Sequence, residues 1–463
     1  MKRPLLFVAC FALLPACGKQ DEAARDAGVP DSSKPRDVQT PDGPAPIPEF
    51  SINVALASDI LPDAPGTVAI VKWSLQGVVP EKAEIRFGLD ANYGMVAPVD
   101  LNEPDYRTLL LGMKPNRTYH FQVVATKGTQ SYQSTDRTLK TGPASNLVNV
   151  TASVHDASSH VPGFIVSTHT QPPNGMTEAE FMTTGSMVLI LDSDGDVVWW
   201  YQSKVGLTPR ARLSYDGKAM WLVPERTDFS GAEIELVTMD TLTSTIYGGL
   251  AASHDATVVD SGDVLAFIDY GSESDCPSVY ELHMDGTKVE IFESTDYLPG
   301  MVLPDCHLNS IRYNKAKDLY TVSDRLTDIF ALDRQGKVEW RLSSMVPNQT
   351  YGGQQHGQQL LDSSILLFAN VGGDGGSSAA LEYSLPDGKE VFRYDPGIFS
   401  IWYGDVQRLP RGNTLVTFSL AGTIHEVDPR GNLVMEVQGE IFGYSEWRST
   451  LYGPPSDIQT SSP

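Results

Sequence analysis

Three histidines recur at a regular spacing in the second half of the chain. His254, His307 and His356 are separated by 53 and 49 residues, and each lies seven or eight residues before the turn of a strand-turn-strand pattern. Imidazoles at the same phase of a repeat can act together at one site, one as a nucleophile and the others as hydrogen-bond donors. A single histidine would carry less weight, because most histidines are ordinary polar residues.

Arg325 is expected to lie beside these histidines. It follows the strand pattern of residues 318–323, which is the second strand of the hairpin that starts at His307. In an antiparallel hairpin the start of the first strand and the end of the second lie at the same end. A guanidinium among three imidazoles is suited to binding a small oxyanion. His169 also ends a second strand and is a weaker candidate for the same end.

Several kinds of chemistry are compatible with this set. Three histidines can ligate a metal ion, with Asp405 in phase one repeat further on, but the guanidinium of Arg325 repels a cation, so no metal is expected. The chain has no nucleophile-elbow motif that would indicate a serine hydrolase. Transfer of an anionic group fits better, with one neutral imidazole attacking and Arg325 neutralising the developing charge. A histidine-metal enzyme and a site that binds an anion without turnover are the alternatives.

A repeated unit positions these residues. It consists of an apolar strand, an aspartate, a tight turn and a strand with aromatic residues, as in residues 191–200. The turns fall at Gly195, Thr243, Gly286, Gly336, Gly388 and Gly431. Spacings of 43 to 52 residues, with four strands per unit, predict the six blades of a β-propeller. The innermost strands of a propeller line its channel, so residues in phase converge at one end.

A second repeated element, strand-turn-strand, precedes five of the six copies. It covers residues 212–222, 254–267, 307–322, 356–368 and 405–418. The first blade, which starts near residues 163–166, lacks this inner strand. Residues 444–452 can supply it. Such a pairing would join the two ends of the domain and remove open sheet edges.

Residues 49–143 show a different pattern, of short alternating strands. Within it, a turn is followed by Thr118-Tyr119-x-Phe121-x-Val123, which resembles the corner and strand F of fibronectin type III domains. No carboxylate pair or metal-ligand spacing occurs there. The sequence therefore predicts an all-β chain: a small fibronectin III-like β-sandwich, then a six-bladed β-propeller that forms the catalytic domain over residues 144–463.

The composition excludes some partners. The chain has 463 residues, of which 41% are hydrophobic, enough for a core but too few for several membrane spans. Its 34 Lys and Arg against 58 Asp and Glu give a net charge of −24. So acidic a surface repels polyphosphates, and no nucleic-acid partner is expected. The oligomeric state is not indicated.

The N-terminal residues resemble an export signal. A short basic start precedes an apolar run at residues 5–14, which is too short to span a bilayer. The run leads into Leu14-Pro15-Ala16-Cys17, which resembles a bacterial lipobox, so residues 1–16 are predicted to be removed and Cys17 to carry a lipid. Residues 17–48 would form a disordered tether. These features predict a lipoprotein on the periplasmic face of a bacterial membrane, the outer membrane because no Asp retention signal follows. The alternative is an ordinary signal peptide cleaved near Cys17.

Two cysteines remain in the part of the chain that is expected to fold. Cys276 and Cys306 are candidates for a disulfide bond, because an exported protein meets an oxidising compartment. Two buried thiols are the alternative. The choice between these readings depends on the export signal, since the same pair in a reducing compartment would stay unpaired.

Five short motifs resemble those of the bacterial arylsulfotransferases. They are Ser253-His254-Asp255, His307-Leu308-Asn309-Ser310, Ser323-Asp324-Arg325, Gln355-His356-Gly357 and Gly404-Asp405-Val406-Gln407-Arg408-Leu409-Pro410. Their order and spacing extend the resemblance over about residues 50–453. Members of that family are exported, carry a β-sandwich before a six-bladed propeller, and move a sulfuryl group from a phenolic sulfate to a phenol without a nucleotide sulfate donor. The resemblance implies an aryl sulfate donor and a phenolic acceptor as partners, and no cofactor.

The resemblance also implies residue roles. His356 matches the family's nucleophile, which becomes transiently sulfated, and a sulfohistidine intermediate gives ping-pong kinetics. His254, His307 and Arg325 match the groups that hold the sulfuryl oxygens. Asn309 and Asp255 are expected to hold these side chains in position. Asp255 directly follows the first histidine.

Four residues are weaker candidates for substrate binding. They are Asn309, Trp402, Tyr403 and Asp405. The two aromatic side chains directly precede Asp405 and are placed to stack on an aromatic ring, although propeller packing explains them equally well. Gly357 departs from the pattern, because many relatives carry a polar residue after the nucleophile.

Overall fold

In the computed structural model the described residues are 48–144, 149–171, 180, 184–225, 232–259, 263–271, 276–297, 306–325, 328–346 and 354–455. The predicted signal peptide, Cys17 and almost all of the tether lie outside them. Strands account for 52% of the structure and helices for 6%, so the all-β prediction is confirmed. Within the described ranges no helix is long and apolar enough to cross a membrane.

The N-terminal strands form two antiparallel sheets. One has the order β1-β2-β5, with β1 (Phe50–Leu56), β2 (Ala69–Leu75) and β5 (Thr108–Leu110). The other has the order β4-β3-β6-β7 with β8 also paired to β6, and its strands are β3 (Lys82–Gly88), β4 (Met95–Pro98), β6 (Thr118–Lys127), β7 (Gln130–Gln133) and β8 (Arg137–Lys140). A short helix, α1 (Ala57–Ile60), follows β1. Trp73, Phe87 and Phe121 from both sheets share one apolar core.

Tyr119 ties the start of β6 to the preceding turn. Its side chain is 1% exposed, and its hydroxyl oxygen accepts a hydrogen bond from the backbone N–H of Lys114 at 2.8 Å. This bond to a residue five positions upstream is the contact that a tyrosine corner makes. The strand itself alternates between buried and less buried residues, as expected where one face of a sheet covers a core.

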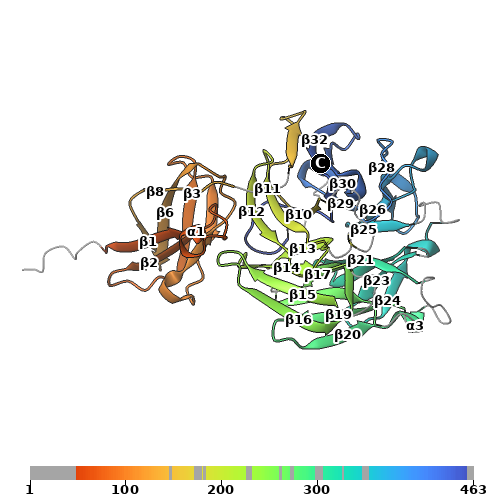
Figure 1. Ribbon diagram of the computed structural model, residues 1–463, viewed down its shortest axis with the longest axis horizontal. Coiled ribbons are helices and arrows are strands. Elements are labelled where there is room, and N and C mark those ends of the chain that lie inside the picture. Colours follow the sequence, from red (N-terminus) through yellow and green to blue (C-terminus); the bar gives the residue numbers. More distant parts are fainter. Residues whose placement is uncertain are drawn as a thin grey trace, which may run out of the picture. The chain divides into compact units, whose positions relative to one another are not determined.

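Six further antiparallel sheets follow along the described chain (Figure 1). Four of them have four strands in chain order: β13 (Arg210–Leu213), β14 (Ala219–Val223), β15 (Ala232–Thr238), β16 (Ser244–Leu250); β17 (Ala252–Val259), β18 (Val264–Asp269), β19 (Ser278–His283), β20 (Lys288–Phe292); β21 (Leu308–Asn314), β22 (Leu319–Asp324), β23 (Asp328–Asp333), β24 (Val338–Arg341); and β25 (Gln355–Leu360), β26 (Ser364–Ala369), β27 (Ala379–Ser384), β28 (Glu390–Tyr394). The helix α3 (Ser294–Tyr297) follows β20.

The other two sheets contain the ends of this region. One consists of β29 (Asp405–Arg408), β30 (Thr414–Phe418), β31 (Thr423–Val427), β32 (Leu433–Gln438) and β9 (Thr151–Val154); the other of β12 (Val197–Gln202), β11 (Met187–Asp192), β10 (Phe164–Thr170), β33 (Ile441–Phe442) and β34 (Glu446–Arg448). The predicted pairing of the C-terminal segment with the first sheet is confirmed, since β34 pairs with β10. The pairing of β9 with β32 was not anticipated.

The predicted turns are built by aspartate side chains. Asp192 accepts hydrogen bonds from the backbone N–H groups of Asp194 and Asp196 at 3.0 and 2.9 Å, and Gly195 takes a φ of +83° between them. Asp333 and Asp428 make the same pair of bonds in their own turns. An aspartate that caps its own turn and a glycine with positive φ explain why the repeat is visible in the sequence.

The innermost strands are neighbours of one another. Contacts join β13 to β17, β17 to β21, β21 to β25 and β25 to β29, and Figure 1 shows these strands around one centre. Gln407 on β29 exchanges two hydrogen bonds with the backbone of Trp447 on β34. Residues at the starts of these strands are therefore brought close together in space.

Candidate active site

Each of the three histidines lies at an irregular strand start. The register of β17 against β18 shifts between Ala252 and Ala256, that of β21 against β22 between Leu308 and Ser310, and that of β25 against β26 between His356 and Gln358. His254 has a φ of +66°, a conformation that non-glycine residues adopt at a cost of order 1–3 kcal/mol. Bulges re-aim side chains, and here they occur at the same phase in three adjacent sheets.

His254 and His307 face each other. Their Nε2 atoms are 3.1 Å apart and their rings are nearly perpendicular, at 88°. Tyr270 stacks on the His254 ring with a centroid separation of 5.4 Å, and its hydroxyl donates to the carbonyl oxygen of Leu308 at 2.8 Å. One N–H must lie between the two Nε2 atoms, because two lone pairs would repel each other. The two imidazoles therefore form a pair that shares one proton.

Asn370 fixes the tautomer of His356. Its side-chain NH2 donates to the carbonyl oxygens of Ser400 and Tyr403 at 2.7 and 2.8 Å, so its Oδ1 is an acceptor. That oxygen lies 2.6 Å from His356 Nδ1. Nδ1 must therefore carry the proton, and in a neutral imidazole the lone pair is then on Nε2. His356 is held in the form in which Nε2 can act as a nucleophile.

Burial keeps the imidazoles neutral. It lowers the pKa of His356 to about 4 and that of His307 to about 3, and it lowers the pKa of His254 well below its usual value. The positive charge of Arg325 acts in the same direction on all three. A neutral histidine keeps its lone pair, so the surroundings favour nucleophilic and proton-transfer chemistry near neutral pH.

The backbone around Arg325 connects two of the histidine strands. The Arg325 N–H donates to the His307 carbonyl oxygen at 2.8 Å, and the Arg325 carbonyl oxygen accepts from Gln354 at 2.8 Å. Its Nε atom is buried and has no hydrogen-bond partner among the described residues. An unsatisfied guanidinium N–H beside three neutral imidazoles is a donor available to an anion. The structure thus brings together the four residues that the sequence pattern selected.

Glu225 lies behind His254 and was not identified from the sequence. One carboxyl oxygen accepts from the Ser253 hydroxyl and from the His254 backbone N–H, both at 3.1 Å. The Ser253 hydroxyl oxygen is in turn 2.9 Å from His254 Nδ1. Burial raises the pKa of Glu225 to about 8. Glu225, Ser253, His254 and His307 form a hydrogen-bonded chain along which a proton can be redistributed.

Replacing Glu225 by glutamine should change the pH dependence of stability. The folded protein keeps the Glu225 proton up to about pH 8, whereas the carboxyl group ordinarily loses it near 4.5, so this group lowers the free energy of unfolding as pH rises between these values. Glutamine does not titrate. In urea unfolding, Glu225→Gln should gain stability relative to wild type from pH 5 to pH 8 by a few kcal/mol, since one pKa unit is ~1.4 kcal/mol. Glu84→Gln, at a more exposed site, is the control; equal pH dependence in all three proteins would contradict this role.

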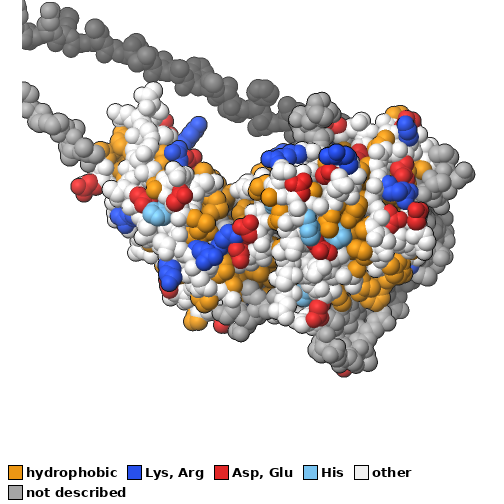
Figure 2. Space-filling model, turned by 90° about the horizontal axis from the view of Figure 1, so that it is seen from above, with side chains coloured by type: hydrophobic (Ala, Val, Ile, Leu, Met, Phe, Trp, Pro, Cys, Tyr) orange, Lys and Arg blue, Asp and Glu red, His pale blue; other side chains and the backbone are white. Residues whose placement is uncertain are grey.

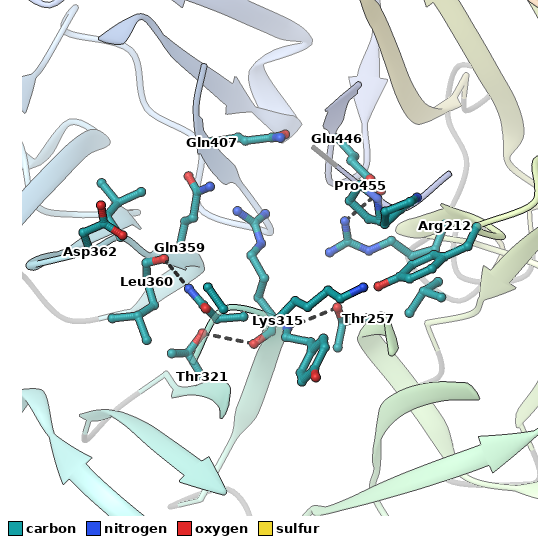
Figure 3. Close-up of a pocket in the computed structure, with 18 residues that line it drawn as sticks. Arg212, Thr257, Lys315, Thr321, Gln359, Leu360, Asp362, Gln407, Glu446 and Pro455 are labelled. Carbon is teal, nitrogen blue, oxygen red and sulfur yellow. Dashed lines mark hydrogen bonds and ion pairs between the residues drawn. The ribbon is translucent and has the colours of Figure 1, made fainter. Parts of the chain in front are cut away.

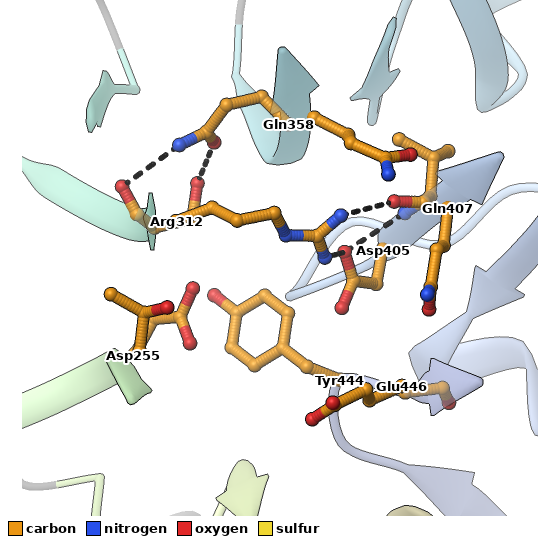
Figure 4. A network of polar contacts seen from close by, with 12 residues as sticks. Asp255, Arg312, Gln358, Asp405, Gln407, Tyr444 and Glu446 are labelled. Carbon is orange, nitrogen blue, oxygen red and sulfur yellow. Dashed lines mark hydrogen bonds and ion pairs between the residues drawn. The ribbon is translucent and has the colours of Figure 1, made fainter. Parts of the chain in front are cut away.

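A polar network begins at Asp255, which directly follows His254, and part of this network is drawn in Figure 4. Arg210 binds Asp255 and lies 2.9 Å from the second oxygen of Asp405, whose first oxygen accepts from Arg312 at 2.8 Å. The Arg210 guanidinium also lies over the Tyr444 ring, 4.3 Å from the ring centroid. Both oxygens of Asp405 are therefore next to arginines, and its predicted contact with substrate stays a prediction.

The other predicted residues have varied surroundings. Asn309 is fully buried, donates to the Gln355 carbonyl oxygen at 2.7 Å, and leaves its Oδ1 without a partner among the described residues. Tyr403 is buried with its ring 6.5 Å from that of His254, whereas Trp402 is 42% exposed. His169 accepts a hydrogen bond from the backbone N–H of Glu440, next to β33. Its predicted place at the site stays a prediction.

A positional rule would have found the missed residues. The residue that directly follows a second strand, or comes two after it, contributes to the site in four consecutive sheets: Glu225, Tyr270, Arg325 and Asn370. In the sequence, this position selected Arg325 and, more weakly, His169, but not the equivalent residues of the other sheets. Because the four side chains differ in type, only their position relates them.

Gly357 leaves no room for a side chain. A Cβ at this position would lie 2.4 Å from Asp405 Oδ1, and its φ is +33°. Gly357→Ser should therefore destabilise the protein by about 2 kcal/mol or more through the clash and backbone strain. Gly397→Ser is the matched control, because Gly397 has a φ of +76° but nothing within 4 Å. Equal losses of stability in urea unfolding would mean that the contact with Asp405 is not the cause.

A disulfide bond ends next to a site residue. Cys276 and Cys306 are bonded, with their Cα atoms 5.6 Å apart, and Cys306 directly precedes His307. The bond connects the chain before β19 to the start of β21. Among the described residues, His, Cys, Asp and Glu side chains do not form a group of three or more that could hold a metal ion.

Together these features define a β-sheet protein with neutral histidines and one arginine gathered at the ends of its inner strands. The arylsulfotransferase (ASST) family model matches residues 304–440, a segment that includes His307, Arg325, His356 and Asp405. The match covers less than half of the chain, and it supports the resemblance to the arylsulfotransferases that the sequence motifs indicated. A comparison with curated proteins gives no match.

Several solved structures are distantly similar. A catalytically inactive variant of virginiamycin B lyase from Staphylococcus aureus has 12% identity and a TM-score of 0.39, covering 67% of this chain and 90% of that one. A streptogramin B lyase has 14% identity and a TM-score of 0.38, with 63% and 88% covered. A gluconolactonase from Xanthomonas campestris has 11% identity and a TM-score of 0.35, and the match covers 61% of this chain and 87% of that one. These similarities are too distant to bear on the function.

Proposed function

We propose that this protein is an aryl sulfate sulfotransferase that works through a sulfohistidine on His356. The observation that carries the proposal is the contact between His356 Nδ1 and Asn370, which leaves a lone pair on Nε2 of an imidazole that is neutral near pH 7. The match of residues 304–440 to the arylsulfotransferase family model supports the reaction class. The neighbouring Arg325 supports an anionic substrate.

In the first half-reaction the His356 Nε2 lone pair attacks the sulfur of an aryl sulfate. The new N–S bond forms as the S–O bond to the aryl group breaks, and the electron pair leaves with the phenolate oxygen. Arg325 offsets negative charge on the sulfuryl oxygens, the main task in a transfer of this kind. The imidazole becomes positive, and Asn370 Oδ1 accepts its Nδ1–H.

The proton for the leaving phenolate comes from the His254–His307 pair. The N–H between their Nε2 atoms passes to the phenolate oxygen while Glu225, which burial keeps protonated near pH 7, supplies a proton to the pair through Ser253, so that no imidazolate anion forms. The phenol departs before the acceptor binds. In the second half-reaction an acceptor phenol attacks the sulfur, its proton returns to the pair, and the N–S bond breaks to restore Nε2. The reaction is ping-pong and leaves every group in its starting state.

We further propose that the six later sheets are the blades of a six-bladed propeller, with the N-terminal sheets as a fibronectin III-like sandwich. The contacts between successive inner strands and the Tyr119 bond support this arrangement. We also propose that Cys17 carries a lipid and that the protein is located in the periplasm, because residues 14–17 resemble a lipobox. Labelling with palmitate tests the lipid, and cell fractionation tests the location.

Incubation with 4-nitrophenyl sulfate and phenol tests the activity. Nitrophenol should appear only with phenol present, and phenyl sulfate should form in equal amount. Release that does not need phenol would indicate a sulfatase. Binding of the sulfate ester without release would indicate a binding protein, and loss of activity on chelation would contradict a metal-free mechanism.

Activity should fall as the pH drops through about 4. Attack requires neutral His356, whose pKa is about 4, so protonation removes the nucleophile below that value. Stability changes over a wider range: the unfolded histidine takes up a proton near 6.5, so between pH 6.5 and 4 the unfolded state binds more protons and the free energy of unfolding decreases as pH falls. Rates under single-turnover conditions from pH 3.5 to 7, with circular dichroism at each pH, separate the two effects. An acid limb near 6.5 with intact fold would contradict burial of the nucleophile.

A further inference from the structure

A second polar cavity lies at the other ends of the inner strands (Figure 3). Whereas the histidines start β17, β21 and β25, this cavity is lined by residues from the far ends of the same strands, among them Val258, Asn314 and Leu360. Arg212, Arg312 and Glu446 also line it. The two sites are thus at opposite ends of one set of strands, with the network of Figure 4 between them.

Charges in this network do not cancel. Among the described residues it contains four guanidinium groups and three carboxylates: Arg210, Arg212, Arg312 and Arg448 with Asp255, Asp405 and Glu446. All seven side chains are buried or nearly so. One positive charge is left over. Burying a net charge costs several kcal/mol unless a counter-charge lies near it.

The excess charge is placed next to the cavity. Arg212 donates through Nε to the Ala256 carbonyl oxygen at 3.0 Å and through Nη1 to Glu446 at 2.9 Å. Its Nη2 is buried and has no partner among the described side chains and backbone, and the residue is only 5% exposed. Glu446 is already shared with Arg448 at 3.1 Å. A charged donor therefore remains unsatisfied at the cavity wall.

The pKa of the neighbouring Arg312 also indicates an excess of positive charge at this cavity. Burial lowers the pKa of Arg312, and the charges of Arg212 and Arg210 lower it further, against the opposite effect of Asp405 and Asp255. At the rim, Lys315 follows β21 and its ammonium lies 6.0 Å from the Tyr215 ring. On the face that Figure 2 shows, basic side chains occur in small separate groups with acidic ones beside most of them, so a broad polyanion has no matching surface there.

We propose that this cavity binds one small inorganic anion, a halide or an oxyanion such as sulfate, held by Arg212 Nη2 and facing Arg312. The anion would complete the charge balance of the network beside the histidines. It is a site separate from the sulfuryl site, and it does not depend on the proposed activity. A water molecule could satisfy the same N–H but would leave the net charge uncompensated.

Bromide is the probe, because its anomalous scattering distinguishes it from water. Crystals of the full chain soaked in sodium bromide should show a peak within hydrogen-bond distance of Arg212 Nη2. In solution, bromide or sulfate added at constant ionic strength, with gluconate as the balancing anion, should raise the melting temperature, and above Kd the rise should grow with the logarithm of the anion concentration. A cavity that contains only water, or a melting temperature no higher than in gluconate alone, would overturn the proposal.

Ala316→Glu tests the charge argument without touching a buried contact. Ala316 lines the cavity from an exposed turn, so a glutamate there supplies a tethered carboxylate. The variant should bind bromide at least about tenfold more weakly, equivalent to ~1.4 kcal/mol, and Ala316→Gln should behave as wild type. Arg212→Gln should also lose the response. An unchanged response in Ala316→Glu and Arg212→Gln would contradict the site.

A further variant distinguishes anion binding in this cavity from anion binding at the three histidines. Arg325→Gln removes the cation proposed to hold the sulfuryl group, yet the bromide response should persist in it, since the cavity is built from other residues. If the response disappears with Arg325 instead, the anion binds at the histidines and the second site does not exist. Neither result requires any sulfotransferase turnover.

Discussion

Replacing His356 by asparagine should reduce sulfuryl transfer by about 10⁴-fold or more, the loss seen when a covalent nucleophile is removed. Asparagine is polar and close in size, but it has no lone pair of comparable basicity to attack sulfur. Since Nε2 of His356 forms the only covalent bond between protein and substrate in the proposed cycle, both half-reactions should stop. The measurement is nitrophenol release from 4-nitrophenyl sulfate with phenol as acceptor.

His425→Asn is the matched control for a buried histidine. His425 is 4% exposed and its Nδ1 lies 2.8 Å from the Tyr394 hydroxyl, in the last sheet. This variant should lose stability but keep its specific activity when folded. Mass spectrometry of the quenched wild-type reaction should find sulfate on the peptide that contains His356. Sulfate on another residue, or turnover in His356→Asn, would overturn the assignment of the nucleophile.

Replacing Arg325 by glutamine should lower the rate of transfer by about 10³-fold, in the range found for removal of a group that stabilises transition-state charge. With the three histidines neutral, the guanidinium supplies the cationic charge next to them. The first half-reaction, measured as a nitrophenol burst, should slow more than binding of the sulfate ester weakens. Arg325→Lys should recover part of the rate, because it restores charge without the planar pair of donors.

A second effect of this substitution separates electrostatics from folding. The Arg325 charge helps to lower the pKa values of His254, His307 and His356, so Arg325→Gln should move the acid limb of the pH profile to higher pH. Arg430→Gln, at a side chain that is 86% exposed, should change neither rate nor profile. A rate loss with an unshifted acid limb would mean that the side-chain charge of Arg325 does not lower the pKa of the nucleophile.

The sequence predicted the repeated sheets because their turns have a local cause. Asp192 and Gly195 make their turn with their own side chain and backbone conformation, so the pattern is visible without tertiary contacts. The pairing of β34 with β10 could be inferred because a sheet lacked its inner strand. In contrast, β9 has only four residues, Thr151 to Val154, three of them exposed, and nothing in such a segment indicates its partner.

The site was predictable as far as periodicity reaches. His254, His307 and His356 share one residue type at one phase, which made them detectable. Glu225 and Asn370 follow the second strands of their own sheets as Arg325 does, but they differ in residue type, so only their position, and not a repeated side chain, marks them. Their importance follows from hydrogen bonds that only the folded backbone creates, such as the two bonds from Asn370 to carbonyl oxygens that determine which way its amide faces.

The neutrality of the three imidazoles has a consequence for the choice of ester. An aryl sulfate carries one negative charge, whereas a phosphate monoester carries about −1.5 to −2 at pH 7. Protonated histidines would suit the phosphate, but burial keeps His254, His307 and His356 uncharged, so Arg325 can offset one charge only. A phosphate ester would enter with charge left uncompensated in a buried site, which is costly. Because its histidines stay uncharged, we expect the protein to favour an aryl sulfate over a phosphate monoester of nearly identical shape.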